Sequence, residues 1–172
     1  MQIFKGATIL LQELQPYLPL RQAVLEQLGL DLFTLSVFWE KFFAISLDLE
    51  SEHSSCPWDA ISNSGLRVEI KYSQSSGSHD CYPYPVFFWR GLQGHKQSYS
   101  KAQVDYYILI GYDASLPLSD ESFTLLAFTH DEIGNRNRIA KTSNPKYRSK
   151  FDKYIKTLLQ VNNEIVSLAP QP

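Results

Sequence analysis

The chain has 172 residues, of which 44% are hydrophobic, 20% are charged and 13% are aromatic. This length fits one domain with a substantial core, and the aromatic content argues against an intrinsically disordered chain. The formal net charge of −2 gives by itself no indication of a nucleic-acid partner, and no stretch approaches the roughly 18 uncharged apolar residues that a membrane span requires.

The N-terminal part of the chain is predicted to be helical. One helix is expected over residues 3–15, ending before Pro16, and a second over residues 20–28, followed by Gly29, a residue that often terminates helices. Residues 32–49 carry apolar side chains at steps of three and four, which predicts a third helix with one buried face.

Residues 57–72 are predicted to form a β-hairpin, because two short apolar runs are separated by a polar turn that ends at Gly65. Successive side chains of a strand point to opposite faces, so Glu69 and Lys71 are expected to share one face of the second strand. Asp59 lies at the start of the first strand. Folding of the hairpin therefore brings Asp59 close to Glu69.

The rest of the chain is predicted to add strands and one long helix to the hairpin. The expected elements are a long loop over residues 73–98 with a short strand at 86–89, a short helix over 98–104, a buried strand over 105–112, a second strand over 123–129, and a last helix beginning near Asn144 and Pro145. The inner face of this last helix would carry Tyr147, Phe151, Tyr154, Leu158 and Ile165. This order predicts a single mixed α/β domain with a central sheet.

Asp59, Glu69 and Lys71 form the candidate catalytic set. Two convergent carboxylates provide the hard oxygen ligands that Mg²⁺ prefers. A lysine beside them can orient a water molecule or offset the charge that grows on phosphate oxygens, so the combination indicates phosphodiester hydrolysis. The alternatives are a solvated ion pair between Glu69 and Lys71, and a turn-flanking or capping role for Asp59.

A hairpin with Asp59 at its start and Glu69-x-Lys71 on its return strand, preceded by a helix that bears Glu40, resembles the PD-(D/E)xK nuclease superfamily. This superfamily includes restriction endonucleases, Holliday-junction resolvases, repair nucleases and some homing endonucleases. The chain departs from the usual Pro-Asp by one inserted residue, Trp58. The resemblance covers the hairpin closely, and the flanking helix and strands more loosely.

The resemblance implies an α/β fold with a restriction-endonuclease-like core, in which a central mixed β-sheet is flanked by helices. It implies Asp59 and Glu69 as metal ligands, Lys71 as the catalytic lysine and Glu40 as a further acidic residue of the active site, with Mg²⁺ as the cofactor. The alternative for Glu40 is an exposed position on the solvent side of its helix. The single nuclease domain would then comprise an N-terminal helical extension, a catalytic core, and a basic loop with the C-terminal helix, at residues 1–30, 31–130 and 131–172.

Charge is distributed unevenly along the chain. Residues 1–60 carry three basic and eight acidic side chains, whereas residues 134–156 carry eight basic and one acidic. Such an excess of cations is typical of a segment that contacts phosphates, and the side chains of Asn135, Arg136, Asn137 and Arg138 are suited to reading base edges. An ordinary solvated surface is the alternative. The predicted DNA contacts are Arg136, Arg138, Lys141, Lys146, Arg148, Lys150 and Lys153.

Together these features predict a Mg²⁺-dependent endonuclease that hydrolyses double-stranded DNA, with a site specificity of the restriction or homing type. One active site cuts one strand, so a homo-oligomer, either a dimer or a higher assembly, is expected. Three alternatives stay open: a non-catalytic DNA-binding or assembly subunit that keeps the fold, a structure-selective repair or junction nuclease, and an enzyme that acts on RNA or small phosphoesters.

The two cysteines, Cys56 and Cys81, do not form the pattern of a disulfide scaffold and fit a reducing compartment. The N-terminus lacks the small-residue cleavage site of a secretory signal peptide, so a cytoplasmic location is expected. With His53 and His79, the cysteines would supply four zinc ligands, although their spacing is not that of a standard zinc finger.

Overall fold

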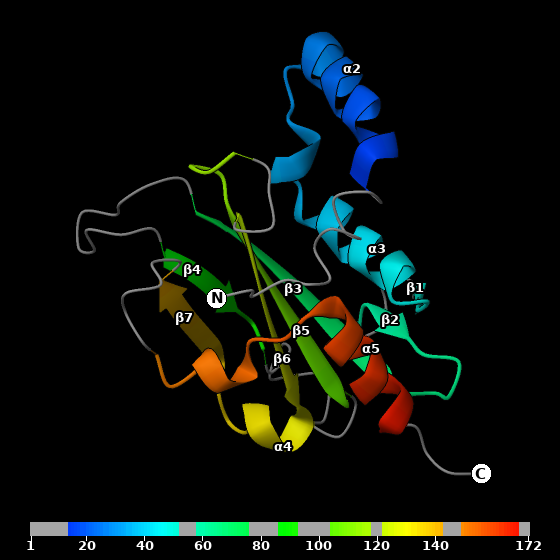
Figure 1. Cartoon of the computed structure of the whole chain (residues 1–172), viewed down its shortest axis with the longest axis vertical. Coiled ribbons are helices and arrows are strands. Elements are labelled where there is room, and N and C mark those ends of the chain that lie inside the picture. Colours follow the sequence, from blue (N-terminus) through cyan, green and yellow to red (C-terminus); the bar gives the residue numbers. More distant parts are fainter. Residues whose placement is uncertain are drawn as a thin grey trace.

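The computed structural model describes residues 14–51, 58–75, 86–92, 104–117, 122–142 and 149–168 (Figure 1). Its main sheet has five strands in the order β1-β2-β3-β5-β6, and a second sheet pairs β4 with β7. The strands are β1 (Glu50–Ser51), β2 (Ala60–Ile61), β3 (Arg67–Ser75), β4 (Val86–Arg90), β5 (Tyr106–Asp113), β6 (Phe123–Thr129) and β7 (Arg138–Thr142). The helices are η1 (Gln15–Tyr17), α2 (Leu18–Leu28), η2 (Leu32–Thr34), α3 (Ser36–Ser46), α4 (His130–Ile133), η5 (Asp152–Tyr154) and α5 (Leu158–Ser167). The predicted mixed α/β domain with a central sheet is confirmed, because β3 and β5 pair in parallel while the other neighbours are antiparallel.

Strand β5 is an interior strand of the main sheet, between β3 and β6, and all of its residues are buried. A near-continuous apolar sequence is typical of a strand that is covered on both faces. The buried strand predicted over residues 105–112 is therefore confirmed to within one residue. The strands predicted over 123–129 and 86–89 are confirmed as β6 and β4.

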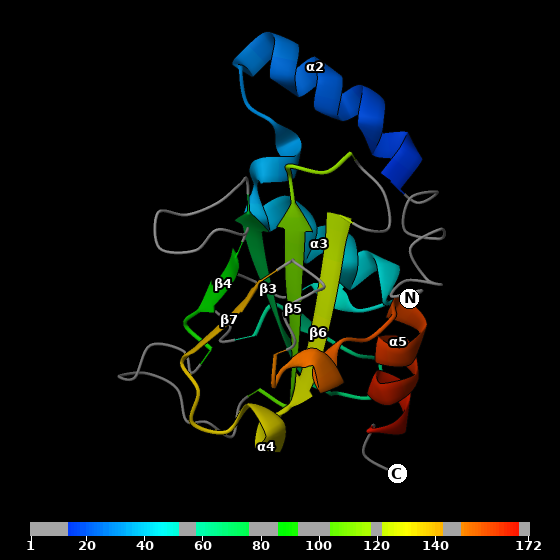
Figure 2. The ribbon, with the colours of Figure 1, turned by 60° about the vertical axis from the view of Figure 1, so that its left-hand side comes forward.

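The main sheet separates two hydrophobic cores. In β5, Tyr106, Ile108 and Ile110 face the larger core, which includes α3 and α5. Tyr107 and Leu109 face the smaller core, which includes β4, β7 and α4. Figure 2 shows the two-stranded β4–β7 ribbon beside β3, and α5 beyond β6 at the other side of the sheet. Helices α3 and α5 thus pack on one face of the main sheet, and the β4–β7 ribbon packs with α4 on the other.

The β4–β7 ribbon approaches β5 very closely. A Cβ atom at Gly111 would lie 2.7 Å from the ring of Phe87, so this position in β5 admits only a residue without a side chain. The indole N–H of Trp89 donates to the carbonyl oxygen of Ile110 at 2.9 Å. These contacts fix the ribbon against the middle of the main sheet.

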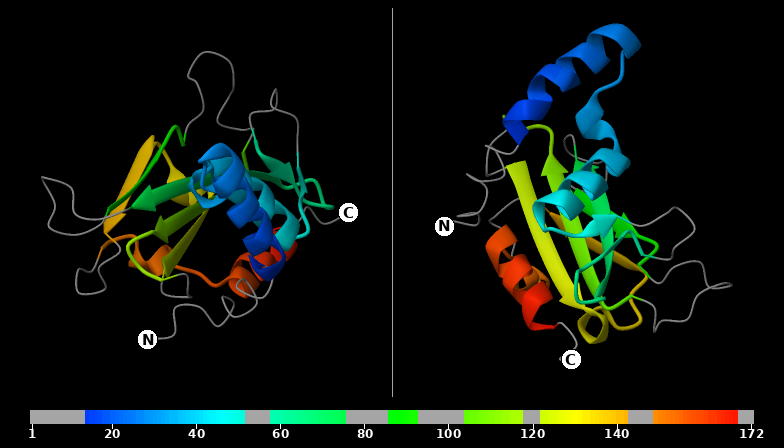
Figure 3. Two further views of the ribbon diagram at one scale, coloured as in Figure 1. Left: turned by 90° about the horizontal axis from the view of Figure 1, so that it is seen from above. Right: turned by 90° about the vertical axis from the view of Figure 1, so that its right-hand side faces the viewer.

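Helix α2 confirms the helix predicted over residues 20–28. It ends at Gly29, whose φ of 66° is the left-handed conformation that glycine adopts at low cost. The guanidinium of Arg21 donates two hydrogen bonds to the carboxylate of Asp31, at 2.8 and 2.7 Å, and so ties the helix to the chain that follows it. Figure 3 shows α2 extending beyond the end of the main sheet. None of the described helices has both the length and the apolar character needed to span a membrane.

The third predicted helix is shorter than expected. Residues 32–49 contain η2, an extended residue at Leu35, and then α3, which ends at Ser46. The carboxylate of Asp31 accepts the N–H of Phe33 at 3.0 Å and caps the start of η2, and the extended Leu35 then separates η2 from α3. The helix predicted over residues 3–15 lies almost entirely outside the described residues.

The last helix begins later than predicted. Its expected start at residues 144–145 lies outside the described residues, but the chain after them turns through η5 and then becomes extended. Ile155 forms an antiparallel bridge with Leu126 of β6, a contact that a continuous helix would not allow. The side chains of Thr157 and Gln160 form a reciprocal capping box, which sets the start of α5.

The common inner face predicted for that helix is consequently wrong. Phe151 and Tyr154 pack in the smaller core, whereas Leu158 and Ile165 pack in the larger core on the opposite side of the main sheet. Tyr147, the remaining member of the predicted face, lies outside the described residues. A helical period cannot describe a segment that crosses from one face of a sheet to the other.

Candidate active site

The β2–β3 hairpin places Asp59 against the edge of β3. Ala60 pairs with Val68, and the N–H of Asp59 donates to the carbonyl oxygen of Val68 at 3.0 Å. The Oδ2 atom of Asp59 accepts the N–H of Ile70 at 2.8 Å. Because β2 begins only at Ala60, opposite Val68, no described strand pairs with this N–H, and the Asp59 carboxylate takes the place of a strand partner.

The ammonium of Lys71 brings the two predicted metal ligands together. Its Nζ atom forms an ion pair with Oε1 of Glu69 and lies 3.8 Å from Oδ2 of Asp59. The three side chains come from one hairpin, as predicted, and two of them share the face of β3 that looks toward the smaller core. The structure therefore brings Asp59, Glu69 and Lys71 into one cluster.

Glu69 is buried, with 8% of its surface exposed, so it does not lie on a solvated strand face. Burial raises the pKa of this carboxyl group to about 7, and the negative charges of Asp59 and Glu40 act in the same direction. The cation of Lys71 lowers the pKa but does not offset these effects. A buried carboxyl group with a shifted pKa beside a lysine is more typical of a functional site than of a surface ion pair.

Glu40 reaches the same cluster from α3. Burial raises its pKa, and the nearby charge of Asp59 raises it further, while Lys71 lowers it. After Val68, no described strand pairs with β3 on the side away from β5. A side chain of α3 can therefore pass around this open edge of the sheet and approach Glu69 and Lys71 on the other face. Glu40 is half-buried and electrostatically coupled to the cluster, which fits the role that the sequence resemblance assigns to it.

Lys71 keeps its proton in this environment. Burial alone lowers the pKa of its ammonium, but the charges of Glu69 and Asp59 outweigh that effect and raise the pKa. The ammonium is therefore a fixed positive charge at neutral pH. It is a poor general base and a good electrostatic partner for an anion.

The donor set fits a hard divalent cation. In the part of the chain that the structure describes, no three His, Cys, Asp or Glu side chains are close enough to form a ready-made metal site. Two carboxylates do converge, and Oδ1 of Asp59 accepts no hydrogen bond from the described residues. Carboxylate oxygens in an anionic, half-buried cluster suit Mg²⁺, which keeps several water ligands and needs few from the protein.

We predict that Glu69 makes the stability of the metal-free protein depend on pH. Its pKa is about 7 in the folded chain and near 4.5 when unperturbed, so between these values the folded state binds more protons than the unfolded state. The free energy of unfolding should therefore fall as the pH rises through this interval. Glu69→Gln should remove this contribution. Urea unfolding in EDTA across the interval measures the difference between variant and wild type.

The control for this experiment is Glu50→Gln, which neutralises an exposed carboxylate of β1 in the same sheet. A Glu69→Gln variant whose difference from wild type varies with pH no more than that of Glu50→Gln would contradict the raised pKa of Glu69. Addition of Mg²⁺ to the wild type should stabilise it more at the alkaline end, where Glu69 is ionised and can bind a cation.

The predicted DNA contacts fall into three groups. Arg138, Lys150 and Lys153 are exposed, as is Arg136, whose guanidinium also donates to backbone carbonyl oxygens at the end of α4. Lys141 is buried and forms an ion pair with Asp152 at 2.8 Å, so its ammonium serves the fold and is not exposed to a nucleic acid. Lys146 and Arg148 lie outside the described residues.

Two features near the site were not evident from the sequence. The guanidinium of Arg67 donates two hydrogen bonds of 2.8 Å to the carboxylate of Asp105 and ties the start of β3 to the start of β5. Tyr107 lies directly opposite Glu69 in the parallel register. Burial and the charge of Glu69 raise the pKa of Tyr107 to about 12. Parallel pairing leaves no local signal in the sequence, so these neighbours become visible only in the structure.

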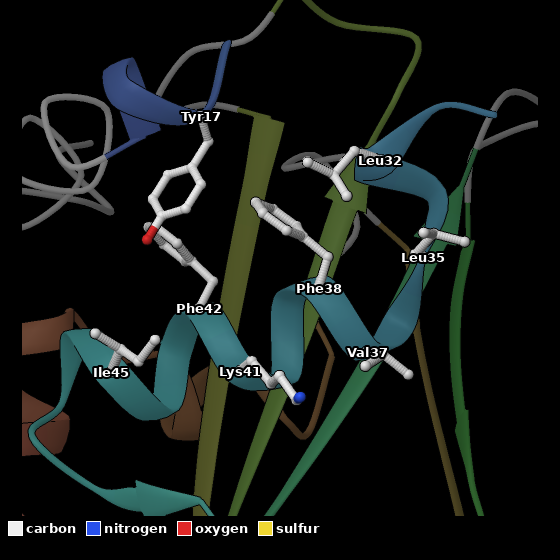
Figure 4. Close-up of a pocket in the computed structure, with 8 residues that line it drawn as sticks. All are labelled: Tyr17, Leu32, Leu35, Val37, Phe38, Lys41, Phe42 and Ile45. Atoms are coloured by element: carbon white, nitrogen blue, oxygen red, sulfur yellow. The ribbon is translucent and has the colours of Figure 1, made fainter. Parts of the chain in front are cut away.

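A separate apolar groove lies on the helical side of the molecule. It has a volume of about 250 Å³ and contains none of the predicted catalytic residues. Figure 4 shows the rings of Tyr17, Phe38 and Phe42 between η1 and α3, with Lys41 as the one charged side chain that lines the groove. The groove lacks the carboxylates that phosphodiester chemistry needs.

The residues of the zinc hypothesis, His53, Cys56, His79 and Cys81, all lie outside the described part of the chain.

The chain matches no protein-family model, and no curated protein is significantly similar to it.

Proposed function

We propose that this protein is a Mg²⁺-dependent endonuclease that hydrolyses phosphodiester bonds of double-stranded DNA. The observation that supports the proposal most directly is the cluster of Asp59, Glu69 and Lys71 around one edge of β3, with Glu69 buried beside a protonated lysine. A structural ion pair has no need of a second carboxylate on the same ammonium. Hydrolysis of an anionic ester needs both the cation ligands and the positive charge.

Each side chain has a distinct task in this proposal. Asp59 and Glu69 would hold the cation, which supplies positive charge to the phosphate and lowers the pKa of a water molecule when bound. The hydrogen bond from the Ile70 N–H fixes the Asp59 carboxylate in place. Lys71 holds its proton and presents it to a non-bridging phosphate oxygen, where negative charge grows in the transition state. Glu40 adds a further anionic group to the cation site.

The fold supports placement in the PD-(D/E)xK superfamily with a restriction-endonuclease-like core. A helix that bears Glu40 precedes the hairpin, and a buried strand pairs with β3 on the side away from β2. These are the features by which the sequence resembles that superfamily. Within it we propose a site-specific enzyme of the restriction or homing type that acts as a dimer or higher oligomer, because cleavage of both strands requires two sites.

Double-stranded DNA is the substrate that the surface charges favour. The described part of the basic segment 134–156 has four cationic side chains that are exposed: Arg136, Arg138, Lys150 and Lys153. The segment contains one acidic residue, Asp152, which pairs with the buried Lys141. Exposed cations gain binding free energy from phosphates by releasing counterions. A small phosphoester would derive little benefit from such a surface.

The proposal is tested by incubating the purified protein with supercoiled plasmid and a sequence-diverse DNA pool, in Mg²⁺ or in EDTA. Nicked or linear plasmid in Mg²⁺ alone is the expected result, and discrete ends in the sequenced pool would support site specificity. Random ends would favour a structure-selective repair role. Intact DNA under all conditions, with DNA binding retained, would overturn the proposal in favour of a non-catalytic DNA-binding subunit.

A further inference from the structure

The β4–β7 ribbon has an outward face that differs sharply from its inward face. In β4, Phe87 and Trp89 point inward and are buried, while Phe88, at 38% exposure, and Arg90 point outward. In β7 the exposed residues are Arg138 and the alanine that pairs with Phe88. The register places Arg90 directly opposite Arg138.

This arrangement sets two positive charges against each other across a strand pair. Like charges at directly opposite positions destabilise a sheet unless an anion lies between or above them. Among the described arginines, Arg21 and Arg67 each form a doubly hydrogen-bonded pair with an aspartate. Within the same described residues, neither Arg90 nor Arg138 has a carboxylate partner. The pair is therefore available to an external anion.

The ribbon is joined directly to the strand that carries the candidate active site. The N–H of Phe88 donates to Oγ of Ser73 at 2.9 Å. Ser73 follows Lys71 by two residues and shares its face of β3, and such positions lie about 7 Å apart along a strand. Figure 2 shows the ribbon beside β3. The ribbon that carries the arginine pair is therefore held beside the strand that carries Lys71, so that one polyanion can contact both.

Resting on the proposed nuclease function, we propose that Arg90 and Arg138 form a phosphate clamp, through which the outward face of the ribbon binds the backbone of the DNA duplex next to the active site. Guanidinium groups bind phosphate oxygens through paired hydrogen bonds, and a two-stranded ribbon has the dimensions to lie along a groove. The sequence indicated Arg138 as a DNA contact within a basic segment. Arg90 lies outside that segment and joins it only through the β4–β7 pairing.

The clamp is tested by fluorescence anisotropy of a labelled DNA duplex in EDTA, which separates binding from cleavage. Arg90→Gln and Arg138→Gln should each weaken binding about tenfold. Each should also reduce the slope of log K against log salt concentration by about one. Lys41→Gln, which removes an exposed cation beside the apolar groove, is the matched control and should change neither quantity. Arg90→Lys should restore the slope and only part of the affinity, because lysine keeps the charge but not the paired hydrogen bonds.

The outcomes for the clamp and for the nuclease are distinguishable. A double Arg90→Gln, Arg138→Gln variant with wild-type affinity and slope would overturn the clamp, even if the wild type cuts DNA in Mg²⁺. A wild type that binds the duplex through both arginines but never cuts it would support the clamp and overturn the nuclease. No binding of duplex by the wild type would overturn both. Melting temperatures of the variants at or above that of the wild type establish that the fold is intact, because neutralising one of two opposed like charges should not destabilise the ribbon.

Discussion

Lys71→Ala is expected to reduce DNA cleavage by about a hundredfold to a thousandfold, because it removes a fixed positive charge from the position where the transition state becomes more negative. Lys71 contacts Glu69 and lies 3.8 Å from Asp59, so its loss also leaves two carboxylates facing each other. Glu69→Gln and Asp59→Asn should have effects of at least the same size, because each removes a charged oxygen ligand. The rate of plasmid nicking, at a Mg²⁺ concentration that saturates the wild type, measures these losses.

Two exposed residues provide matched controls for these substitutions. Lys41→Ala removes a lysine from α3, and Glu50→Gln neutralises a glutamate in β1; both should cleave DNA at the wild-type rate. Circular dichroism and thermal melting establish that each variant is folded. Full activity of folded Lys71→Ala would refute the catalytic role of the lysine. Raising the Mg²⁺ concentration should partly rescue Asp59→Asn and should not rescue Lys71→Ala.

Trp39→Ala is expected to destabilise the protein by about 4 kcal/mol, the largest effect on stability that we predict for a single substitution. Trp39 is fully buried in α3 and lies at the centre of an aromatic cluster. Its ring is 5.0 Å from that of Phe33 and 5.1 Å from that of Phe123 of β6, and it stacks on Tyr72 of β3. Removal of the indole leaves a cavity between α3 and two strands of the main sheet.

The cavity is expected to account for most of this loss. The indole N–H of Trp39 donates to the carbonyl oxygen of Phe33 at 2.7 Å, but that oxygen also accepts the hydroxyl of Tyr72 at 2.8 Å and stays satisfied. Trp39→Phe should therefore lose much less stability than Trp39→Ala. Ile45→Ala in the same helix, where the side chain is 67% exposed, should change the free energy of unfolding by less than about 0.5 kcal/mol. Urea unfolding measures all three, and a Trp39→Ala loss as small as that of Ile45→Ala would contradict the role of the cluster.

The parts of the fold that the sequence predicted well are those with a local signal. The β5 strand shows an unbroken apolar run, and the hairpin shows alternation on both sides of a polar turn. Because Asp59, Glu69 and Lys71 all belong to that hairpin, their convergence follows from local geometry. Glu40 was placed by resemblance, and the structure couples it to the cluster through the open edge of β3.

The parts that were missed depend on contacts between distant segments. Strand β7 was not predicted, because one of its inward positions is Lys141, whose charge hides the alternation of apolar residues. That lysine is buried because Asp152, in a later turn, neutralises it. The start of α5 was placed too early because basic and aromatic residues before Thr157 imitate a helical period. The clamp arginine Arg90 could not be found, because its partner Arg138 lies in a strand that the sequence did not reveal.

The spacing of the site residues along the chain also bears on the order of folding. The hydrogen bond between Ile70 and Asp59 joins residues 11 apart, whereas that between Arg67 and Asp105 joins residues 38 apart. Closing a longer loop costs more entropy and slows the contacts that depend on it. We therefore expect the hairpin to form early, while the carboxyl group of Glu69 is still hydrated. Glu69 should lose its water only when β5 docks and pairs in parallel with β3.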